Sequence, residues 1–168
     1  DGLILVAAGA GGHAGLTNPM SLITEVKAFF DKTILLSGCI STGNDIASAL
    51  QMGADLAYMG TRFINVDESL ADEEYKQMII DSNASDIVYT AAVSGVNANF
   101  LRPSLESMGI TEDMWAQTTK IDFGEELAAA KAEAKAWKTI WSAGQGVTSI
   151  DDSVSTTTLI DRLKEQFV

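Results

Sequence analysis

Three short turns within the first 63 residues carry the groups that could do chemistry. The first, GAGGHAG at residues 9 to 15, contains His13, the single histidine of the chain. An imidazole exchanges a proton near neutral pH, as removal of a proton from a carbon acid requires. The surrounding glycines would let a flat or phosphorylated ligand approach the backbone, because they lack a Cβ atom. The turn indicates a ligand site with His13 as proton acceptor, against the alternative of a surface histidine that only makes hydrogen bonds.

The other two turns offer backbone amides to an anion. Residues 37 to 43, SGCISTG, open directly into a predicted helix, whose first amides and dipole favour negative charge. Residues 59 to 63, MGTRF, add further amides, the Thr61 hydroxyl and the Arg62 guanidinium, although Arg62 could instead pair with a surface carboxylate. Two such turns on consecutive strands are typical of the phosphate site after the last two strands of a βα barrel.

Each turn follows an apolar segment whose pattern predicts a buried parallel strand. These strands are expected within residues 3 to 8, 33 to 38 and 54 to 60, covered on both faces. A helix beginning at Asn18 and Pro19 and running to about Asp31 follows the first, and a helix over residues 44 to 52 follows the second. This alternation predicts βαβ units with neighbouring parallel strands.

The alternation stops after Gly60. We expect an acidic helix over residues 68 to 81, either a strand or an extended linker over 86 to 93, a helix over 125 to 141 and a final helix over about 155 to 167. The carboxylates of this region are expected to face solvent. The three tryptophans are expected to pack in the protein interior. No composition shift marks a boundary, so residues 1–168 are treated as part of one domain.

Three strands buried on both faces cannot form a complete sheet. The predicted fold class is α/β: the C-terminal part of a TIM (β/α)8 barrel, with parallel strands 6 to 8 plus additional helices and the N-terminal strands absent. Such barrels take about 250 residues, and a doubly wound three-layer fold is the competitor. The open strand edges would need a second copy of the chain, or a partner chain supplying the missing strands.

Composition limits the function classes. The 168 residues carry a formal net charge of −12, which repels nucleic-acid phosphates and anionic lipid, so neither is an expected partner. One cysteine, Cys39, cannot form an internal disulfide, and one cysteine with one histidine cannot make an ordinary zinc site, so no metal is expected. No apolar run approaches the length of a membrane helix, and we expect a cytoplasmic protein.

The motifs resemble those of the nitronate monooxygenases, also called 2-nitropropane dioxygenases. The resemblance rests on GAGGHAG, LLSGCISTGNDIASALQMGAD, AYMGTRF and WSAGQG, in that order. It implies an FMN-binding barrel in which His13 is catalytic and Gly38, Gly60 and Thr61 bind the FMN phosphate. The same resemblance places Gly12, Cys39 and Met59 beside the flavin. It also implies that Gln145 and its neighbouring glycines in WSAGQG approach the pocket, without assigning them a role.

The activity expected from this resemblance is oxidation of an alkyl nitronate or nitroalkane with O2. Similar glycine and histidine motifs leave open an FMN-dependent enoyl-ACP reductase. A non-redox barrel that binds a phosphorylated metabolite is a third hypothesis, because a phosphate site does not identify the rest of its ligand. A subunit without cofactor that only packs against a partner is a fourth. Cys39 as a nucleophile with His13 as its base has weak support.

Overall fold

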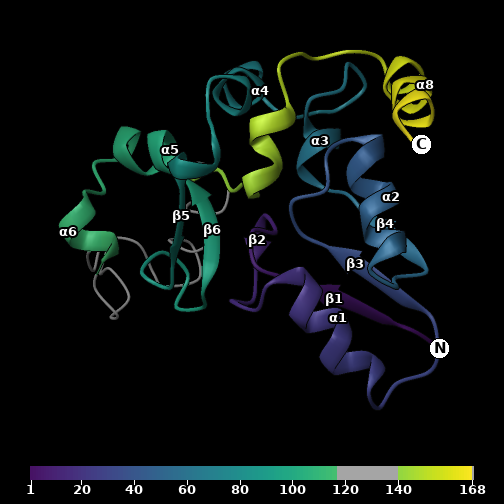
Figure 1. The fold of residues 1–168 in the computed structure, drawn as a ribbon. Coiled ribbons are helices and arrows are strands. Elements are labelled where there is room, and N and C mark those ends of the chain that lie inside the picture. Colours follow the sequence, from purple (N-terminus) through teal and green to yellow (C-terminus); the bar gives the residue numbers. More distant parts are fainter. Residues whose placement is uncertain (117–139, 168) are drawn as a thin grey trace.

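The parallel sheet predicted from the sequence is present in the computed structural model, which describes residues 1–116 and 140–167. It contains β1 (Leu3–Val6), β3 (Ile34–Ser37) and β4 (Leu56–Tyr58), in the order β1-β3-β4. Both pairings are parallel, with Leu5 opposite Leu36 and Leu36 opposite Ala57. The carboxyl ends of the three strands therefore lie at one edge, beside the turns that could do chemistry (Figure 1).

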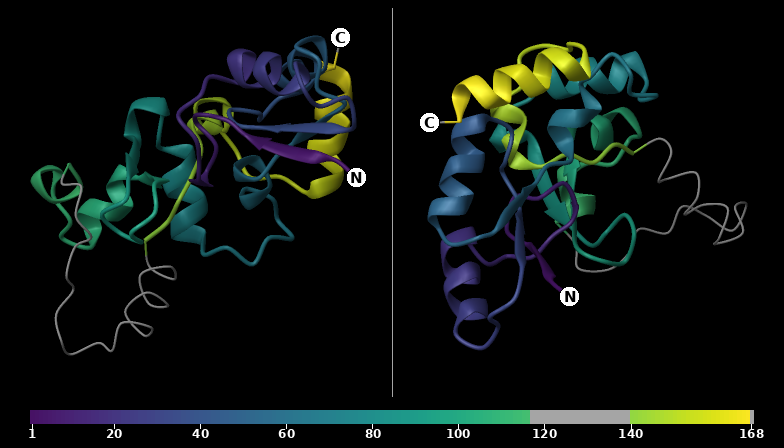
Figure 2. Two further views of the ribbon diagram at one scale, coloured as in Figure 1. Left: turned by 90° about the horizontal axis from the view of Figure 1, so that it is seen from below. Right: turned by 90° about the vertical axis from the view of Figure 1, so that its right-hand side faces the viewer.

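Helices cover one face of this sheet. Asn18 caps α1 (Pro19–Lys27) as predicted, but the helix ends at Lys27 rather than near Asp31. A capping box of Thr42 and Asp45 begins α2 (Gly43–Gln51). Between the helices and the sheet lies a core cluster that includes Leu5, Ile23, Val26, Ile34, Leu36 and Ala49. The predicted final helix is α8 (Thr156–Gln166), which packs beside α2 (Figure 2).

The opposite face of the parallel sheet is open. Ile4, Val6, Leu56 and Tyr58 are 53%, 40%, 54% and 49% exposed. The expectation of strands covered on both faces is therefore wrong for this face of the chain. These side chains occupy alternate positions on β1 and β4, and alternate residues of a barrel strand point into the barrel interior. An exposed apolar face of this kind is what part of a barrel presents.

A second sheet was not predicted. It is antiparallel, in the order β2 (Gly12–His13), β6 (Ala98–Leu101), β5 (Ile87–Thr90), and lies with α5 (Arg102–Ser107) and α6 (Glu112–Trp115) on the left of Figure 1. From the sequence we expect additional helices beside the parallel strands, with a strand as an alternative only over residues 86 to 93. Residues 87–90 are a strand rather than a linker. All four residues of β6 are buried, so it lacks the alternation that marks a half-buried strand.

The remaining elements are short. They are α3 (Thr61–Ile64), α4 (Glu73–Ile80), and the 3-10 turns η1 (Ala84–Asp86) and η2 (Gln145–Ser149). The acidic helix expected from residue 68 begins only at Glu73, with Asp72 at its N-cap position. The Glu68 carboxylate instead accepts hydrogen bonds from Thr156 at the start of α8. The helix expected over 125 to 141 falls almost entirely outside the described residues. Within the described residues, no helix has the length and apolarity to cross a membrane.

The capping box of α2 yields a stability prediction. The Thr42 hydroxyl accepts from the Asp45 amide, so Thr42→Ala should lower the free energy of unfolding by about 1 kcal/mol. Ser48→Ala on the same helix is the control, because its exposed hydroxyl donates to Asn44 O without capping the helix. Chemical denaturation measures both. Equal effects of the two substitutions would contradict this role for Thr42.

Candidate functional site

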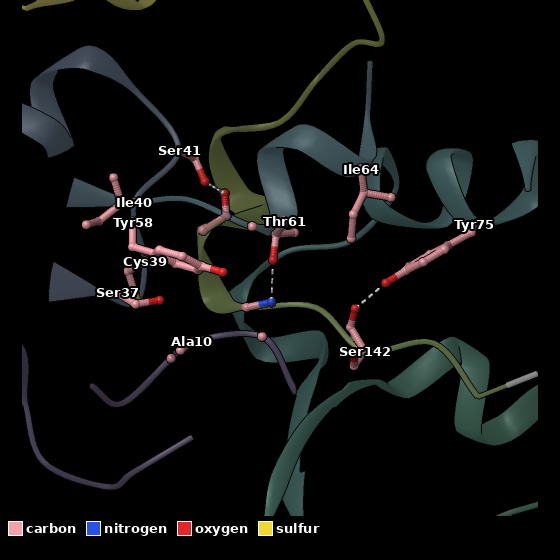
Figure 3. Close-up of a pocket in the computed structure, with 16 residues that line it drawn as sticks. Ala10, Ser37, Cys39, Ile40, Ser41, Tyr58, Thr61, Ile64, Tyr75 and Ser142 are labelled. Carbon is pink, nitrogen blue, oxygen red and sulfur yellow. Dashed lines mark hydrogen bonds between the residues drawn. The ribbon is translucent and has the colours of Figure 1, made fainter. Parts of the chain in front are cut away.

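A cavity of about 150 Å³ opens at the carboxyl ends of β3 and β4. Small-molecule sites usually measure about 300 to 1,000 Å³. This cavity suits one group the size of a phosphate better than a whole coenzyme. Most of its lining is backbone and small side chains, and Figure 3 shows it enclosed between the strand ends, α3 and the segment around Ser142. It is lined by Gly9, Ala10, Gly11, Ser37, Gly38, Cys39, Ile40, Ser41, Tyr58, Gly60, Thr61, Ile64, Tyr75, Ser142, Gly144 and Gly146.

The structure brings four of the predicted site residues to this cavity. They are Gly38, Cys39, Gly60 and Thr61. The side chain of Met59 is directed elsewhere, since it packs against the two core clusters beneath α2 and α8. Gly12 and His13 form β2, outside the lining of the cavity, and His13 is exposed.

Backbone amides are the main polar groups of the lining. Gly38 has φ +128° and Cys39 has φ +58°, and Cys39 alone among the described non-glycine residues has a positive φ. Two successive residues with positive φ turn the chain sharply after β3, and both residues line the cavity. The amides of Cys39, Ile40, Gly60 and Thr61 form no hydrogen bond within the described residues. They can therefore donate to an anion.

The start of α2 is not the anion site that the sequence suggested. The Asp45 carboxylate accepts from the amides of Ser41 and Thr42, at 3.0 and 2.8 Å. Gln166 of α8 accepts from the Gly43 amide at 3.0 Å. The expectation of free amides there is wrong, because side chains of the chain itself satisfy them. An anion in this cavity must use the amides that precede the helix, at Cys39 and Ile40.

The Cys39 thiol is not activated. Burial raises its pKa, and the negative charge of Asp45 raises it further. Its Sγ lies 3.7 Å from Ala8 O and 3.8 Å from Gln145 Oε1, both acceptors that favour the protonated thiol. Since the thiolate is the nucleophilic form, this environment disfavours covalent chemistry at Cys39.

Residues 142 to 146 cross the site and are tied to three turns. The Gly144 amide donates to Thr61 Oγ1 at 3.0 Å, and the Gln145 amide donates to Gly9 O at 2.8 Å. The Ser41 hydroxyl donates to Gly146 O at 2.9 Å. Gly144 and Gly146 line the cavity, in agreement with the expectation that Gln145 and its glycines approach the pocket. The small residues of SAGQG suit a chain that passes close to other backbone.

Tyr75 of α4 closes the cavity on the side of Ser142. Its hydroxyl donates to Ser142 O, and its ring stacks on Trp141 with centroids 5.0 Å apart (Figure 3). Burial raises the pKa of Tyr75 to about 12, so the phenol remains a neutral donor at physiological pH. Sequence reasoning placed Tyr75 only among the apolar residues of an acidic helix, because nothing in the local pattern shows its contact with a segment 67 residues away.

The antiparallel sheet holds the turn that carries His13. In the ladder between β2 and β6, His13 lies opposite Ala98 and Gly12 opposite Asn99. Buried Asn99 donates from Nδ2 to Ala10 O at 2.7 Å, and the Tyr89 hydroxyl donates to Ala14 O at 2.9 Å. The turn is thus fixed on both sides of His13.

Arg62 pairs with a carboxylate and does not face the cavity. It is 2% exposed, and its guanidinium binds Asp152 at 2.8 Å. Among the described residues, no group of His, Cys, Asp and Glu side chains could hold a metal ion. The polar chemistry of the site therefore consists of backbone amides, hydroxyls and one imidazole nearby.

Comparisons with known proteins identify relatives of the chain. Residues 1–166 match the family described as nitronate monooxygenase. A nitronate monooxygenase of Paraburkholderia phytofirmans is 30% identical over 146 residues, which cover 79% of this chain and 40% of that protein. A probable nitronate monooxygenase of Bacillus subtilis is 25% identical over 99% of this chain and 51% of its own length.

Solved structures of two proteins are also similar to this chain. A nitroalkane oxidase from Streptomyces ansochromogenes superposes with a TM-score of 0.76 at 27% identity, over 99% of this chain and 51% of that one. FabK from Thermotoga maritima gives a TM-score of 0.75 at 27% identity, over 99% and 54%. The chain therefore spans about half the length of the relatives it matches.

The close contact of residues 142 to 146 with the turn at residues 9 to 11 yields a second prediction. A Cβ on Gly144 would lie 2.6 Å from Gly9 O and 2.8 Å from the Gly11 amide nitrogen, so Gly144→Ala should cost about 1 to 3 kcal/mol in the free energy of unfolding. Gly60→Ala is the control, because nothing lies within 4 Å of a Cβ there, and its effect should stay within about 0.5 kcal/mol. Denaturant titration distinguishes them, and a neutral Gly144→Ala would refute the close contact.

Proposed function

The chain belongs to the nitronate monooxygenase family, and from this premise we propose that it forms the phosphate-binding and histidine-bearing part of an FMN-dependent enzyme that oxidises alkyl nitronates or nitroalkanes with O2. The observation that carries the proposal is the cavity at the ends of two adjacent parallel strands. Its lining includes four amides without an acceptor among the described residues, at Cys39, Ile40, Gly60 and Thr61.

The residues of the cavity fit the phosphate of FMN. Amide donors to an ionised acceptor make strong hydrogen bonds, and the glycines permit close approach. Gly38, Gly60 and Thr61 would hold the phosphate, with Cys39 contributing through its backbone. A cavity of about 150 Å³ cannot contain the whole coenzyme, so the flavin ring must lie outside it. When bound, FMN supplies the electron transfer and the reaction with O2.

His13 is the proposed proton acceptor. In a neutral nitroalkane, the nitro group acidifies the adjacent C–H bond, and the imidazole would take that proton to leave the anionic nitronate. The resulting imidazolium would then hold the anion by charge. Asn99 and Tyr89 would keep the turn in place during this step, because they bind the carbonyls of Ala10 and Ala14 on either side of His13.

The open face of the parallel sheet suggests how the site is completed. We propose that Ile4, Val6, Leu56 and Tyr58 face the interior of a (β/α)8 barrel, in which β1, β3 and β4 are strands 6 to 8 and other strands cover them. The exposure of these four side chains supports this, since an apolar face of this size is rarely left in water. The completing strands would also supply the second side of the flavin site.

An FMN-dependent enoyl-ACP reductase is the second candidate. The near-equal TM-scores of FabK, 0.75, and of the nitroalkane oxidase, 0.76, keep it open, because the fold does not separate them. Oxidation of NADH that depends on an enoyl thioester would favour the reductase. Consumption of O2 with an alkyl nitronate, without NADH, would favour the monooxygenase.

The phosphate site predicts a preference among flavins. The protein should bind FMN at least about tenfold more tightly than riboflavin, since the lost amide–phosphate bonds are each worth about 1.5 to 3 kcal/mol. Quenching of flavin fluorescence measures both affinities. Equal affinity for the two flavins would argue against the site, and binding of other phosphorylated metabolites without flavin would favour the non-redox alternative.

Replacement of the imidazole tests the chemical step. His13→Asn should lower turnover of the neutral nitroalkane by about 10²- to 10⁴-fold, the usual contribution of a positioned general base. The anionic nitronate needs no deprotonation, so its turnover should fall less. The preference for FMN over riboflavin should persist in this variant, because His13 lies outside the cavity proposed for the phosphate. Unchanged rates for both substrates would remove His13 from the mechanism.

A further inference from the structure

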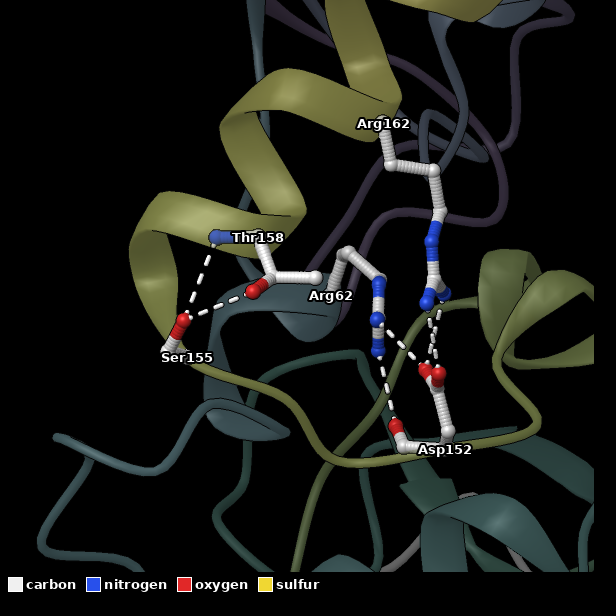
Figure 4. Close-up of polar contacts among 5 residues, drawn as sticks. All are labelled: Arg62, Asp152, Ser155, Thr158 and Arg162. Atoms are coloured by element: carbon white, nitrogen blue, oxygen red, sulfur yellow. Dashed lines mark hydrogen bonds and ion pairs between the residues drawn. The ribbon is translucent and has the colours of Figure 1, made fainter.

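A single carboxylate joins two arginines behind the turn formed by Gly60 and Thr61. Asp152 Oδ1 accepts from Arg62 Nη2 at 2.8 Å and from Arg162 Nη1 at 3.0 Å, and its Oδ2 accepts from Arg162 Nη2 at 2.8 Å. Arg62 Nη1 also donates to the Asp152 carbonyl at 3.0 Å. Figure 4 shows the carboxylate between the two guanidinium groups, one from α3 and one from α8.

The buried Arg62 side chain anchors the turn formed by Gly60 and Thr61. It follows Thr61 directly, and α3 has only four residues, so the helix itself offers little to fix the orientation of its first amides. The Arg62 side chain is 3% exposed, and Asp152 provides its hydrogen bonds within the described residues. A buried guanidinium without its carboxylate is strongly unfavourable, so loss of Asp152 would displace Arg62 and the turn beside it.

The cluster also carries charge. Hydrogen bonds from Arg162, then the charges of both arginines, lower the pKa of Asp152, so the carboxylate is ionised at neutral pH. Two guanidiniums share the Asp152 carboxylate, and the negative charge of Asp151 also acts on Arg162, so the formal charges of these four groups cancel. The cluster therefore acts on the phosphate site through the position of Arg62 and of the turn beside it, and not through a surplus of positive charge.

We propose that Asp152 is a positioning residue for the phosphate site: by holding Arg62 against α8, it sets the amides of Gly60 and Thr61 toward the anion. This inference rests on the proposed function, since the anion is the FMN phosphate. Asp152 does not line the cavity and does not touch the ligand. Its effect should therefore depend on whether the flavin carries a phosphate.

Comparison of FMN with riboflavin tests this. Asp152→Asn should weaken FMN binding by about tenfold, equivalent to about 1.4 kcal/mol, and leave riboflavin binding unchanged. Asp161→Asn is the matched control: it removes the same charge from an exposed pair with Lys164, 3.1 Å apart, and should leave both affinities unchanged. A purely structural role for Asp152 would weaken both flavins equally.

If Asp152→Asn does not fold, substitutions of Arg162 and Lys164 test the same role. Arg162→Gln leaves the pair of Arg62 and Asp152 intact but removes the second guanidinium, while Lys164→Gln removes one positive charge from the same helix at an exposed position. Arg162→Gln should weaken FMN binding selectively and Lys164→Gln should not. Equal losses for FMN and riboflavin, or no loss, would overturn the inference. A wild-type protein that does not distinguish the two flavins would instead refute the phosphate site itself.

Discussion

Backbone lies directly against backbone where residues 142 to 146 cross the turn at residues 9 to 11. A Cβ on Gly144 would fall 2.6 Å from Gly9 O, and one on Gly11 would fall 2.8 Å from the Gly144 amide. This close approach lets the Gly144 amide reach Thr61 and the Gln145 amide reach Gly9. Residues 142 to 146 thus hold together three turns: the one at residues 9 to 15, the one at 37 to 43 and the one at 59 to 63. The cavity depends on this segment, which cannot move away without breaking its contacts to all three turns.

Charge divides the site into two unequal sides. On the side of α2, Asp45 accepts from the amides of Ser41 and Thr42, and burial together with the charge of Asp45 raises the pKa of the Cys39 thiol, so this side offers neutral amide donors. On the side of α3, Arg62 and Arg162 share the Asp152 carboxylate, and the charge of Asp151 also acts on Arg162, so these charges cancel. The dipole of helix α2 is partly offset by Asp45. Attraction of an anion therefore has to come mainly from the loop amides.

Local signals predicted the fold where the chain obeys local rules. The apolar runs, the Asn18 cap and the turn glycines give β1, β3, β4 and the helices after them, because each depends on neighbours a few residues away. Long-range contacts were not predictable in this way. Strand β6 has no alternation because all of it is buried, and Tyr75 meets Ser142 across 67 residues. The start of α2 was interpreted only as a set of free amides, whereas the capping box of Thr42 and Asp45 fills this helix end.

The cavity and the open face of the parallel sheet differ in how complete they are. The cavity needs only the turns after two adjacent strands, and both turns are present, with their supporting contacts to 142–146 and to Asp152. The parallel sheet is incomplete by comparison, because Ile4, Val6, Leu56 and Tyr58 remain exposed on one of its faces. The turns are held by contacts within the described residues, whereas cover for this face depends on contacts beyond them. A property that depends on the turns alone is therefore physically separable from one that depends on closure of the sheet.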